Sequence, residues 1–373
     1  MAITINTSPN TITPAYSQIN WNMTSNDANI KAIRVDLYVN GVYSTTLDAV
    51  QQLGSTSTFN VDVQKIVQAT LVHEIRTNIT SFAVTNAVTS AATIKIRAFE
   101  IILSGGVYTT TWASGGLGTG YTESSNVKVI NMALQDGETL ANYTVDDATK
   151  LLLTTRSQNT KLPKGVPFQI GFLGADTNYV AILVEKDING TSINAYTTSI
   201  LASLTHGKGI IEIPASVFAN EFTQYLTITL QKSEVADRSI TYTFEVYDYA
   251  KNLPIFIQNH LGDFDHYNFG AKESTEIETQ NQKIKKSTGD ITVHSEVNSR
   301  TKYYTGSLSQ ADLTFLTEFI KNHSVVYRWD GANDLNRIVI TSHSEKVYDT
   351  QGLVNALAIT VANSVQHKVQ KGD

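Results

Sequence analysis

Apolar and polar residues alternate along much of the chain, which is the pattern of β-strands that bury one face and expose the other. Residues 239–246 have apolar or aromatic side chains at even positions and polar side chains at odd positions. Residues 33–39 alternate in the opposite phase and run into Asn40-Gly41, a dipeptide that accepts positive φ at both turn positions. The chain is therefore predicted to be mainly β, with a two-residue hairpin turn at Asn40-Gly41.

Glycine-containing turns predict two more hairpins. One joins residues 93–103 to residues 107–112, and the other turns at Asn189-Gly190. Short strands separated by turns in this way are typical of antiparallel β-sandwiches. The other strands predicted in the middle of the chain cover residues 168–173, 179–185, 209–213, 225–230 and 239–247.

Two segments carry apolar residues at helical spacing instead. Asp62 is a suitable N-cap for the first of them. The second covers residues 309–322, where Ser309 is the expected N-cap and Leu308 and Leu313 are spaced to form a hydrophobic staple. We predict that the apolar face of this second helix docks on the sheet of its own domain.

Polar, turn-rich stretches at residues 135–149 and 249–254 divide the pattern into three parts. The predicted fold has two antiparallel β-sandwich-like domains and a C-terminal β-sheet-and-helix domain. The N-terminal sandwich is expected over residues 1–148 with a short helix near 62–71, the second sandwich, of Ig/FN3-like kind, over 149–250, and the C-terminal domain over 251–373 with its helix near 310–322.

The charge balance argues against a general nucleic-acid-binding protein. The 373 residues include 28 Lys and Arg against 34 Asp and Glu, for a formal charge of −6, and proteins that bind phosphates need a basic face. The densest basic cluster is Lys283, Lys285 and Lys286, which we expect on a solvated strand edge. Because the chain has no cysteine, it has no disulfide, no thiolate nucleophile and no zinc site with Cys ligands.

Neither a targeting segment nor a membrane span is expected. The first residues lack the basic and apolar regions of a secretory signal. The longest apolar runs, such as residues 151–153 and 180–184, are far shorter than the ~20 residues that cross a bilayer. We therefore expect a soluble, uncleaved chain that does not insert into a membrane.

The densest group of potential metal ligands is His260, Asp263, Asp265 and His266. Imidazole nitrogens and carboxylate oxygens are ordinary ligands of divalent metals. Gly262-Asp263, however, has the composition of a turn that brings the following aromatic residues onto a sheet. The turn is the favoured interpretation, and no metal site is expected.

Other motifs lack the residues that their chemistry needs. The glycines of residues 115–120 have neither the Lys-Ser/Thr pair of a P-loop nor the spacing of a dinucleotide fingerprint, so we expect a mobile surface loop or arm. Residues 330–334 lack the ligand spacing of a calcium loop and are predicted to form a turn. We expect no catalytic residue and no cofactor.

Five segments carry a family resemblance: residues 5–21, 36–41, 59–67, 151–156 and 256–269. In order and in sequence they resemble virion structural proteins of tailed phages that infect Bacteroidota, including crAss-like phages. This resemblance implies a structural role, carries over no catalytic residue, and implies that the last segment is a framework turn and strand.

The C-terminal part adds a fold-level analogy. Strands predicted at residues 325–329, 337–341 and 353–362, together with the helix at 309–322, are similar to the sheet-and-helix module of tail-tube and tail-hub proteins. Such modules associate around a symmetry axis, so the analogy implies a ring.

The leading hypothesis is a non-enzymatic virion component: a ring-forming tail or tail-neck protein, assembled in the host bacterial cytoplasm, that contacts copies of itself and other phage tail or neck proteins. One alternative is a receptor-binding or glycan-binding tail module that contacts a host-surface glycan through residues 115–121, Tyr121 among them, and other exposed tyrosines. A second alternative is a hydrolase whose site is formed only in space.

Overall fold

The computed structural model describes residues 3–55, 57–145, 151–156, 161–174, 178–218, 220–232, 235–247, 253–269, 271–286, 289–305, 308, 310–321, 326–329, 335–346, 356–363 and 367–369. Within these residues the chain is mainly β, as the sequence predicts, and forms five sheets and two α-helices.

The N-terminal part is a sandwich of two sheets around one core, which includes Trp21, Phe59 and Ile96. The Asn40-Gly41 hairpin is confirmed, with φ of 51° and 80° at the two turn residues. One sheet has the order β1 (Ile3–Thr7), β3 (Asn20–Ser25), β7 (Thr58–Asp62) and β6 (Val50–Gln51). The other has the order β2 (Ile12–Pro14), β12 (Val127–Ile130), β9 (Ala91–Ser104), β4 (Ile30–Val39) and β5 (Val42–Asp48), with β10 (Val107–Thr110) and β11 (Thr122–Glu123) also paired to β9.

The central part is a second pair of sheets, with Phe172, Tyr179 and Ile228 in the core. The strands predicted in this part and the hairpin at Asn189-Gly190 are confirmed. One sheet has the order β13 (Lys161–Pro163), β19 (Val235–Tyr247), β18 (Tyr225–Lys232), β15 (Tyr179–Lys186) and β16 (Ser192–Thr197). The other has the order β14 (Phe168–Leu173), β17 (Lys208–Ile213) and β8 (Ala83–Asn86).

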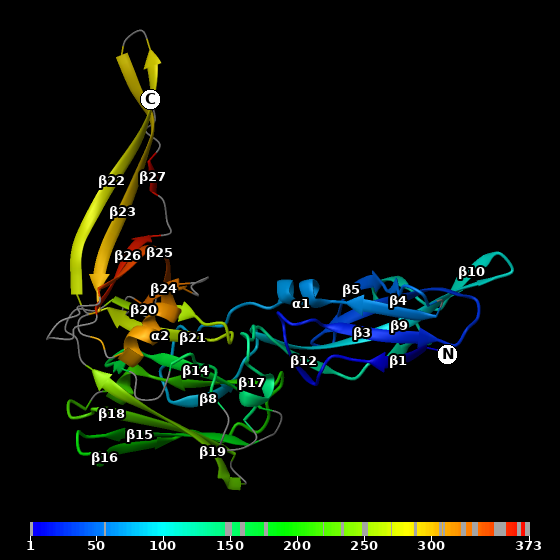
Figure 1. The fold of residues 1–373 in the computed structure, drawn as a ribbon, viewed down its shortest axis with the longest axis horizontal. Helices are drawn as coiled ribbons and strands as arrows, with labels where there is room; N and C mark the ends of the chain where they lie inside the picture. The colour runs from blue at the N-terminus through cyan, green and yellow to red at the C-terminus, as the bar shows by residue number, and fades with distance from the viewer. Residues whose placement is uncertain are drawn as a thin grey trace.

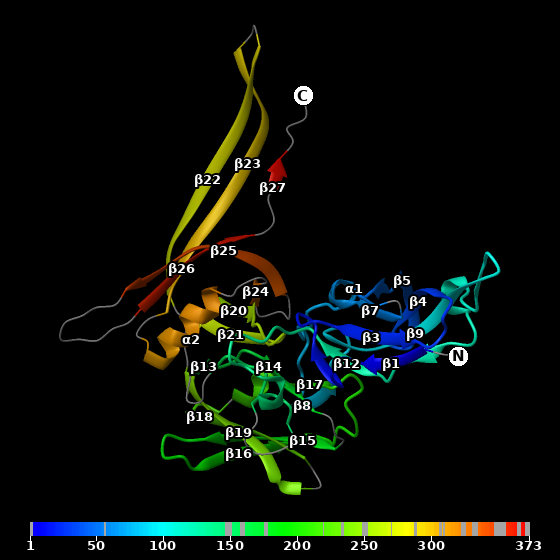
Figure 2. The same cartoon turned by 45° about the vertical axis from the view of Figure 1, so that its right-hand side comes forward.

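One strand of the central part comes from the N-terminal segment. After α1 (Gln64–Thr70), the chain leaves the first sandwich, pairs β8 with β17, and returns to the first sandwich as β9. Figure 2 shows β8 beside β14 and β17 at the place where the two parts meet. The predicted domain boundaries near residues 148 and 250 stay a prediction, but the two sandwiches are joined by more than a linker.

The C-terminal part is one antiparallel sheet covered by a helix. Its order is β21 (Phe264–Phe269), β20 (Leu253–Gln258), β24 (Val326–Trp329), β25 (Leu335–Lys346), β26 (Ala356–Asn363), β23 (Gly289–Tyr304) and β22 (Ala271–Lys286), with β27 (His367–Val369) also paired to β23. The helix α2 (Gln310–Lys321) buries Leu316 and Ile320 in the same core as Ile359 of the sheet.

Both predicted helices are confirmed. The first begins at Gln64, and its N-cap is Val63 and not the expected Asp62. The Asp62 carboxylate lies one residue further back and accepts from the backbone N–H of Gln64, at 2.9 Å from Oδ1. In the second, the side chains of Leu308 and Leu313 are both buried. The expected N-cap Ser309 lies outside the described residues, as does the turn predicted at residues 330–334.

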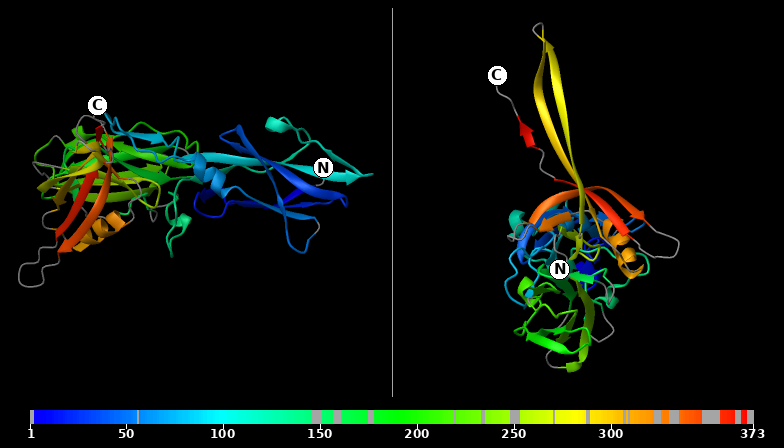
Figure 3. Two further views of the ribbon diagram at one scale, coloured as in Figure 1. Left: turned by 90° about the horizontal axis from the view of Figure 1, so that it is seen from above. Right: turned by 90° about the vertical axis from the view of Figure 1, so that its left-hand side faces the viewer.

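The β22–β23 hairpin extends away from the rest of the molecule. Each of its strands has 16 residues, which corresponds to about 50 Å of extended chain. Figure 1 and the right-hand view of Figure 3 both show it rising from the C-terminal sheet, while the N-terminal sandwich runs out along the horizontal axis of Figure 1. The sequence did not predict this hairpin.

Candidate assembly interface

The longest unpaired strand edge among the described residues belongs to β22. This strand ends the sheet order and pairs only with β23. The other side of β23 pairs with β26 and β27. The outer edge of β22 thus offers a row of backbone N–H and C=O groups to another chain. The edge position predicted for residues 283–286 is confirmed, because they lie in β22.

The four potential metal ligands lie in four separate environments. His260 Nε2 contacts Glu138 Oε2 at 3.0 Å. Asp265 accepts hydrogen bonds from Asn259 and from the threonines at positions 154 and 155. The ring of His266 stacks against Phe168 and Phe256, and burial, followed by the charge of Arg156, holds its pKa well below the usual value. In the part of the chain described here, no three His, Asp or Glu side chains are arranged to hold a metal ion.

The fourth ligand candidate, Asp263, belongs to a buried polar network between the three parts of the molecule. Gln169 Nε2 donates to Asp263 Oδ1 at 2.6 Å, and the backbone N–H of Gly171 donates to Asp263 Oδ2. Lys208 Nζ, from the neighbouring strand β17, donates to the carbonyl of Gly262 at 2.7 Å. Because Gly262 has φ of +76° and stands against the backbone of residue 131, the turn cannot accept a larger residue there.

Glu74 and Arg76 extend this network, which we call the junction network. Glu74 Oε2 accepts the backbone N–H groups of residues 88–90 at 2.8 to 3.2 Å. Arg76 pairs with Glu74 Oε1 at 2.8 Å and with Glu212 at 3.2 Å. The network therefore ties the β8 crossover to β14, β17 and the β20–β21 turn.

Burial governs the ionisation of the junction network. It lowers the pKa of Lys208 and raises the pKa of Asp263, since both side chains are fully enclosed. Burial also acts to raise the pKa of Glu74, but the backbone N–H donors and Arg76 outweigh it, so this pKa lies below its usual value. The groups with these pKa shifts are buried between sheets, where a substrate could not reach them.

The glycine-rich segment is packed onto the first sandwich and is not an extended arm. We call residues 111–121 the strap. A Cβ added at Gly118 would lie 2.5 Å from the ring of Phe99, and one at Gly116 would lie 2.6 Å from the Tyr38 hydroxyl. These glycines are needed for close contact with aromatic rings, and not for phosphate binding.

Two tyrosines at the strap, Tyr38 beneath it and Tyr121 at its end, contact Arg97. The guanidinium carbon of Arg97 lies 4.4 Å from the ring centre of Tyr38 and 4.2 Å from that of Tyr121. Tyr121 also packs edge-on against Phe99. Arg97 therefore occupies one face of Tyr38 and one face of Tyr121, and sugar rings need a free aromatic face. Tyr16 and Tyr108, by contrast, are more than half exposed.

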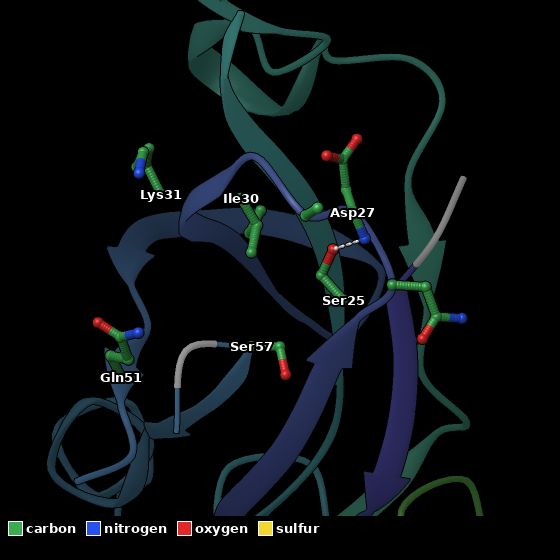
Figure 4. A pocket seen from close by; sticks show the side chains of 8 residues that line it. Ser25, Asp27, Ile30, Lys31, Gln51 and Ser57 are labelled. Atoms are coloured by element: carbon green, nitrogen blue, oxygen red, sulfur yellow. Dashed lines mark hydrogen bonds between the residues drawn. The ribbon is translucent and has the colours of Figure 1, made fainter. Parts of the chain in front are cut away.

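A polar groove lies at the free end of the first sandwich (Figure 4). It has a volume of about 550 Å³ and is lined by residues 25–28, Ile30, Lys31, Gln51 and Ser57. Ser25 Oγ accepts from the backbone N–H of Asp27 at 3.1 Å. Figure 4 shows Lys31, Gln51 and Asp27 spread around the groove and not converging on one point.

The sequence does not predict the β22–β23 hairpin or the junction network, for two different reasons. The β22–β23 hairpin lacks the apolar alternation of a half-buried strand, so a search for one buried face passes over it. The junction network joins residues that are far apart in the chain, and the sequence predicts only the turn at Gly262-Asp263.

Neither described α-helix has the length and apolar content needed to span a bilayer.

Comparisons with known proteins give no family. No protein-family model matches the chain, and no curated protein does. Solved structures that match include fibronectin(III)-like modules of Clostridium thermocellum CbhA (11% identity, 66% of this chain and 94% of that one, TM-score 0.16) and a marsupial T cell receptor (8% identity, 100% of both chains, TM-score 0.19). A third is a bacterial ice-binding adhesin involved in host cell surface retention (11%, 81% and 91%, 0.19). With TM-scores this low, none of the three supports an argument about fold or function.

Proposed function

We propose that this chain is a non-enzymatic structural component of a phage virion, most simply a ring-forming tail or tail-neck protein. The observation that carries the proposal is the β22–β23 hairpin, whose outer edge has no partner strand among the described residues. A long edge of this kind is normally shielded or paired. Pairing with the next copy in a ring would cover it, and the finished ring would then contact neighbouring tail or neck proteins.

The junction network supports the same proposal. A ring closes only if every subunit holds its contact surfaces at a fixed angle. Lys208, Asp263 and Glu74 join the N-terminal sandwich to the parts that carry the hairpin. A subunit fixed in this way suits repeated, identical contacts in a virion that assembles in the host cytoplasm.

Shortening the hairpin tests the proposal. Residues 278–298 would be replaced by Asn-Gly, which connects the paired residues Ile277 and Ser299 and preserves the pairing of β23 with β26. Negative-stain images and sedimentation should show rings or larger oligomers for the full chain and monomers for the shortened one, at equal melting temperature. A full chain that stays monomeric at high concentration, with antibodies that do not label phage particles, contradicts the proposal.

The alternative of a receptor-binding or glycan-binding tail module is favoured by one observation, the polar groove of Figure 4. A glycan array with the purified chain tests it. Binding that is lost in Tyr121→Ala would assign the site to the strap, and binding that is lost in Asp27→Ala would assign it to the groove. The hydrolase alternative has less support, because the carboxylates and histidines with shifted pKa values are enclosed or engaged with neighbouring groups.

A further inference from the structure

The strap is held to the first sandwich by side chains more than by its backbone. Besides the bonds within its short 3-10 helix Ser114–Gly116, the strap has one recorded backbone–backbone hydrogen bond among the described residues, from Thr119 N–H to the carbonyl of Thr111 at 3.2 Å, and none of the recorded ones joins it to β4 or β9. At the apex of the strap, the side chain of Leu117 is 78% exposed. Segments with few backbone hydrogen bonds and few buried apolar contacts open at low free-energy cost.

The side-chain contacts lie at three points along the strap. Near its start, the Trp112 indole N–H donates to Asp36 Oδ1 at 3.0 Å, and its ring lies 4.4 Å from the Arg34 guanidinium carbon. In its middle, the Tyr38 hydroxyl donates to the carbonyl of Gly116 at 3.1 Å. At its end, Tyr121 stacks on Arg97. Each of the three contacts is made to β4 or β9, two strands that pair with each other.

Asp36 gives a reason for the strap to open. Its side chain is fully buried, Oδ1 accepts from Thr46 Oγ1 and Trp112 Nε1, and Oδ2 has no hydrogen-bond partner among the described residues. A buried carboxylate oxygen without a partner is costly, and this cost is removed when water reaches it. Opening the strap would hydrate Asp36, and the free energy gained in this way offsets part of the free energy of the contacts that are lost.

We propose that the strap is a hinged cover that swings off the outer face of β4 and β9 as one unit. Its ends can rotate at Gly120, which has φ of +66°, and next to Thr110, where β10 stops. In the closed state it hides Phe99, Tyr38 and Asp36, and in the open state this face becomes available for contact. The inference rests on the contacts of the strap alone and is independent of any ring.

Fluorine NMR on protein labelled with 5-fluorotryptophan measures this motion. The chain has three tryptophans, and Trp112→Phe identifies the resonance of Trp112. We expect relaxation dispersion at Trp112 and not at Trp21, which is fully buried in the first core. A Trp112 signal without exchange broadening would overturn the proposal.

One variant shifts the equilibrium toward the open state. Tyr38→Phe removes the hydroxyl that bonds to Gly116 while keeping the ring, and should raise the open population about fivefold.

A control keeps the test interpretable. Leu117→Ala, at the exposed apex, should leave the exchange unchanged. Exchange that is unaffected by Tyr38→Phe would show that Trp112 moves without the strap.

Discussion

Two polar clusters in this chain are built from similar groups and differ in where they lie. The junction network encloses Lys208, Asp263 and Glu74 between sheets. The second cluster, which we call the strap face, lies on the surface of the first sandwich beside the strap. It contains the ion pairs of Lys95 and Arg97 with Glu123 and of Arg34 with Asp48, and these side chains are half-buried or exposed. Charges at the surface keep their water, whereas those in the junction have exchanged it for fixed partners.

The difference shows which cluster determines the shape of the molecule. A buried charge that loses its partner destabilises the fold strongly, because no water replaces the partner. A surface pair that is broken is rehydrated at little cost. We therefore expect the junction network to fix how the three parts are oriented, and the strap face to control only a local motion.

The largest expected effect is that of Lys208→Met. Its Nζ is fully buried and donates to Gly262, and its charge faces Asp263 and Glu74. Removing the ammonium takes the favourable positive charge away from the two carboxyl groups and leaves the Gly262 carbonyl without its donor. We expect the free energy of unfolding, measured by urea titration, to fall by about 3 kcal/mol.

The matched control is Lys65→Met, an exposed lysine in α1, which should change stability by less than about 0.5 kcal/mol. If the two variants were equally stable, the buried charge of the junction network would contribute no more to stability than an exposed one, and the contrast between the clusters would be wrong.

The sequence predicts local features of both regions and misses what joins them. The Asn40-Gly41 turn and the strand at residues 239–247 are set by neighbouring residues, so periodicity and turn chemistry suffice. Asp263 was visible only as part of a turn, because its partners Gln169 and Lys208 come from strands 55 or more positions away. Non-local pairing of this kind produces no periodic pattern in the sequence. The pairing of β8 with β17 of the central part is non-local as well and produces none either.

Glu74→Gln should have the next largest effect. The carboxylate accepts three backbone N–H groups and pairs with Arg76. The amide keeps the shape, but its neutral oxygen is a weaker acceptor and its NH₂ group repels donors, so we expect a loss of about 2 kcal/mol at pH 7. Glu221→Gln, at an exposed position in a loop, is the control and should be close to neutral.

The pH dependence of the native chain and of Glu74→Gln tests whether Glu74 acts as an ionised acceptor. The pKa of Glu74 is lowered in the folded chain from its ordinary value of 4.5. Its stabilisation is therefore complete above that value and is lost as the pH falls through the lower folded pKa, because the unfolded chain then takes up the proton first. The difference in unfolding free energy between the native chain and Glu74→Gln should shrink between pH 5 and the acid limit of folding, by an amount that chemical denaturation at each pH measures. A difference that stays constant or grows would mean that Glu74 is not the ionised acceptor.

The smallest effect is expected at the surface, with Asp48→Asn. This carboxylate pairs with Arg34 at 2.9 Å, but its side chain is 65% exposed, so solvent screens the attraction. We expect a loss below about 0.5 kcal/mol that disappears in 1 M salt. Arg34 also stacks on Trp112 of the strap, and this contact does not involve Asp48. Asp48→Asn should therefore leave the chemical shift of the Trp112 resonance unchanged. If Asp48→Asn instead costs as much as Glu74→Gln, and the cost survives high salt, then surface pairs also determine the fold and the contrast between the two clusters does not hold.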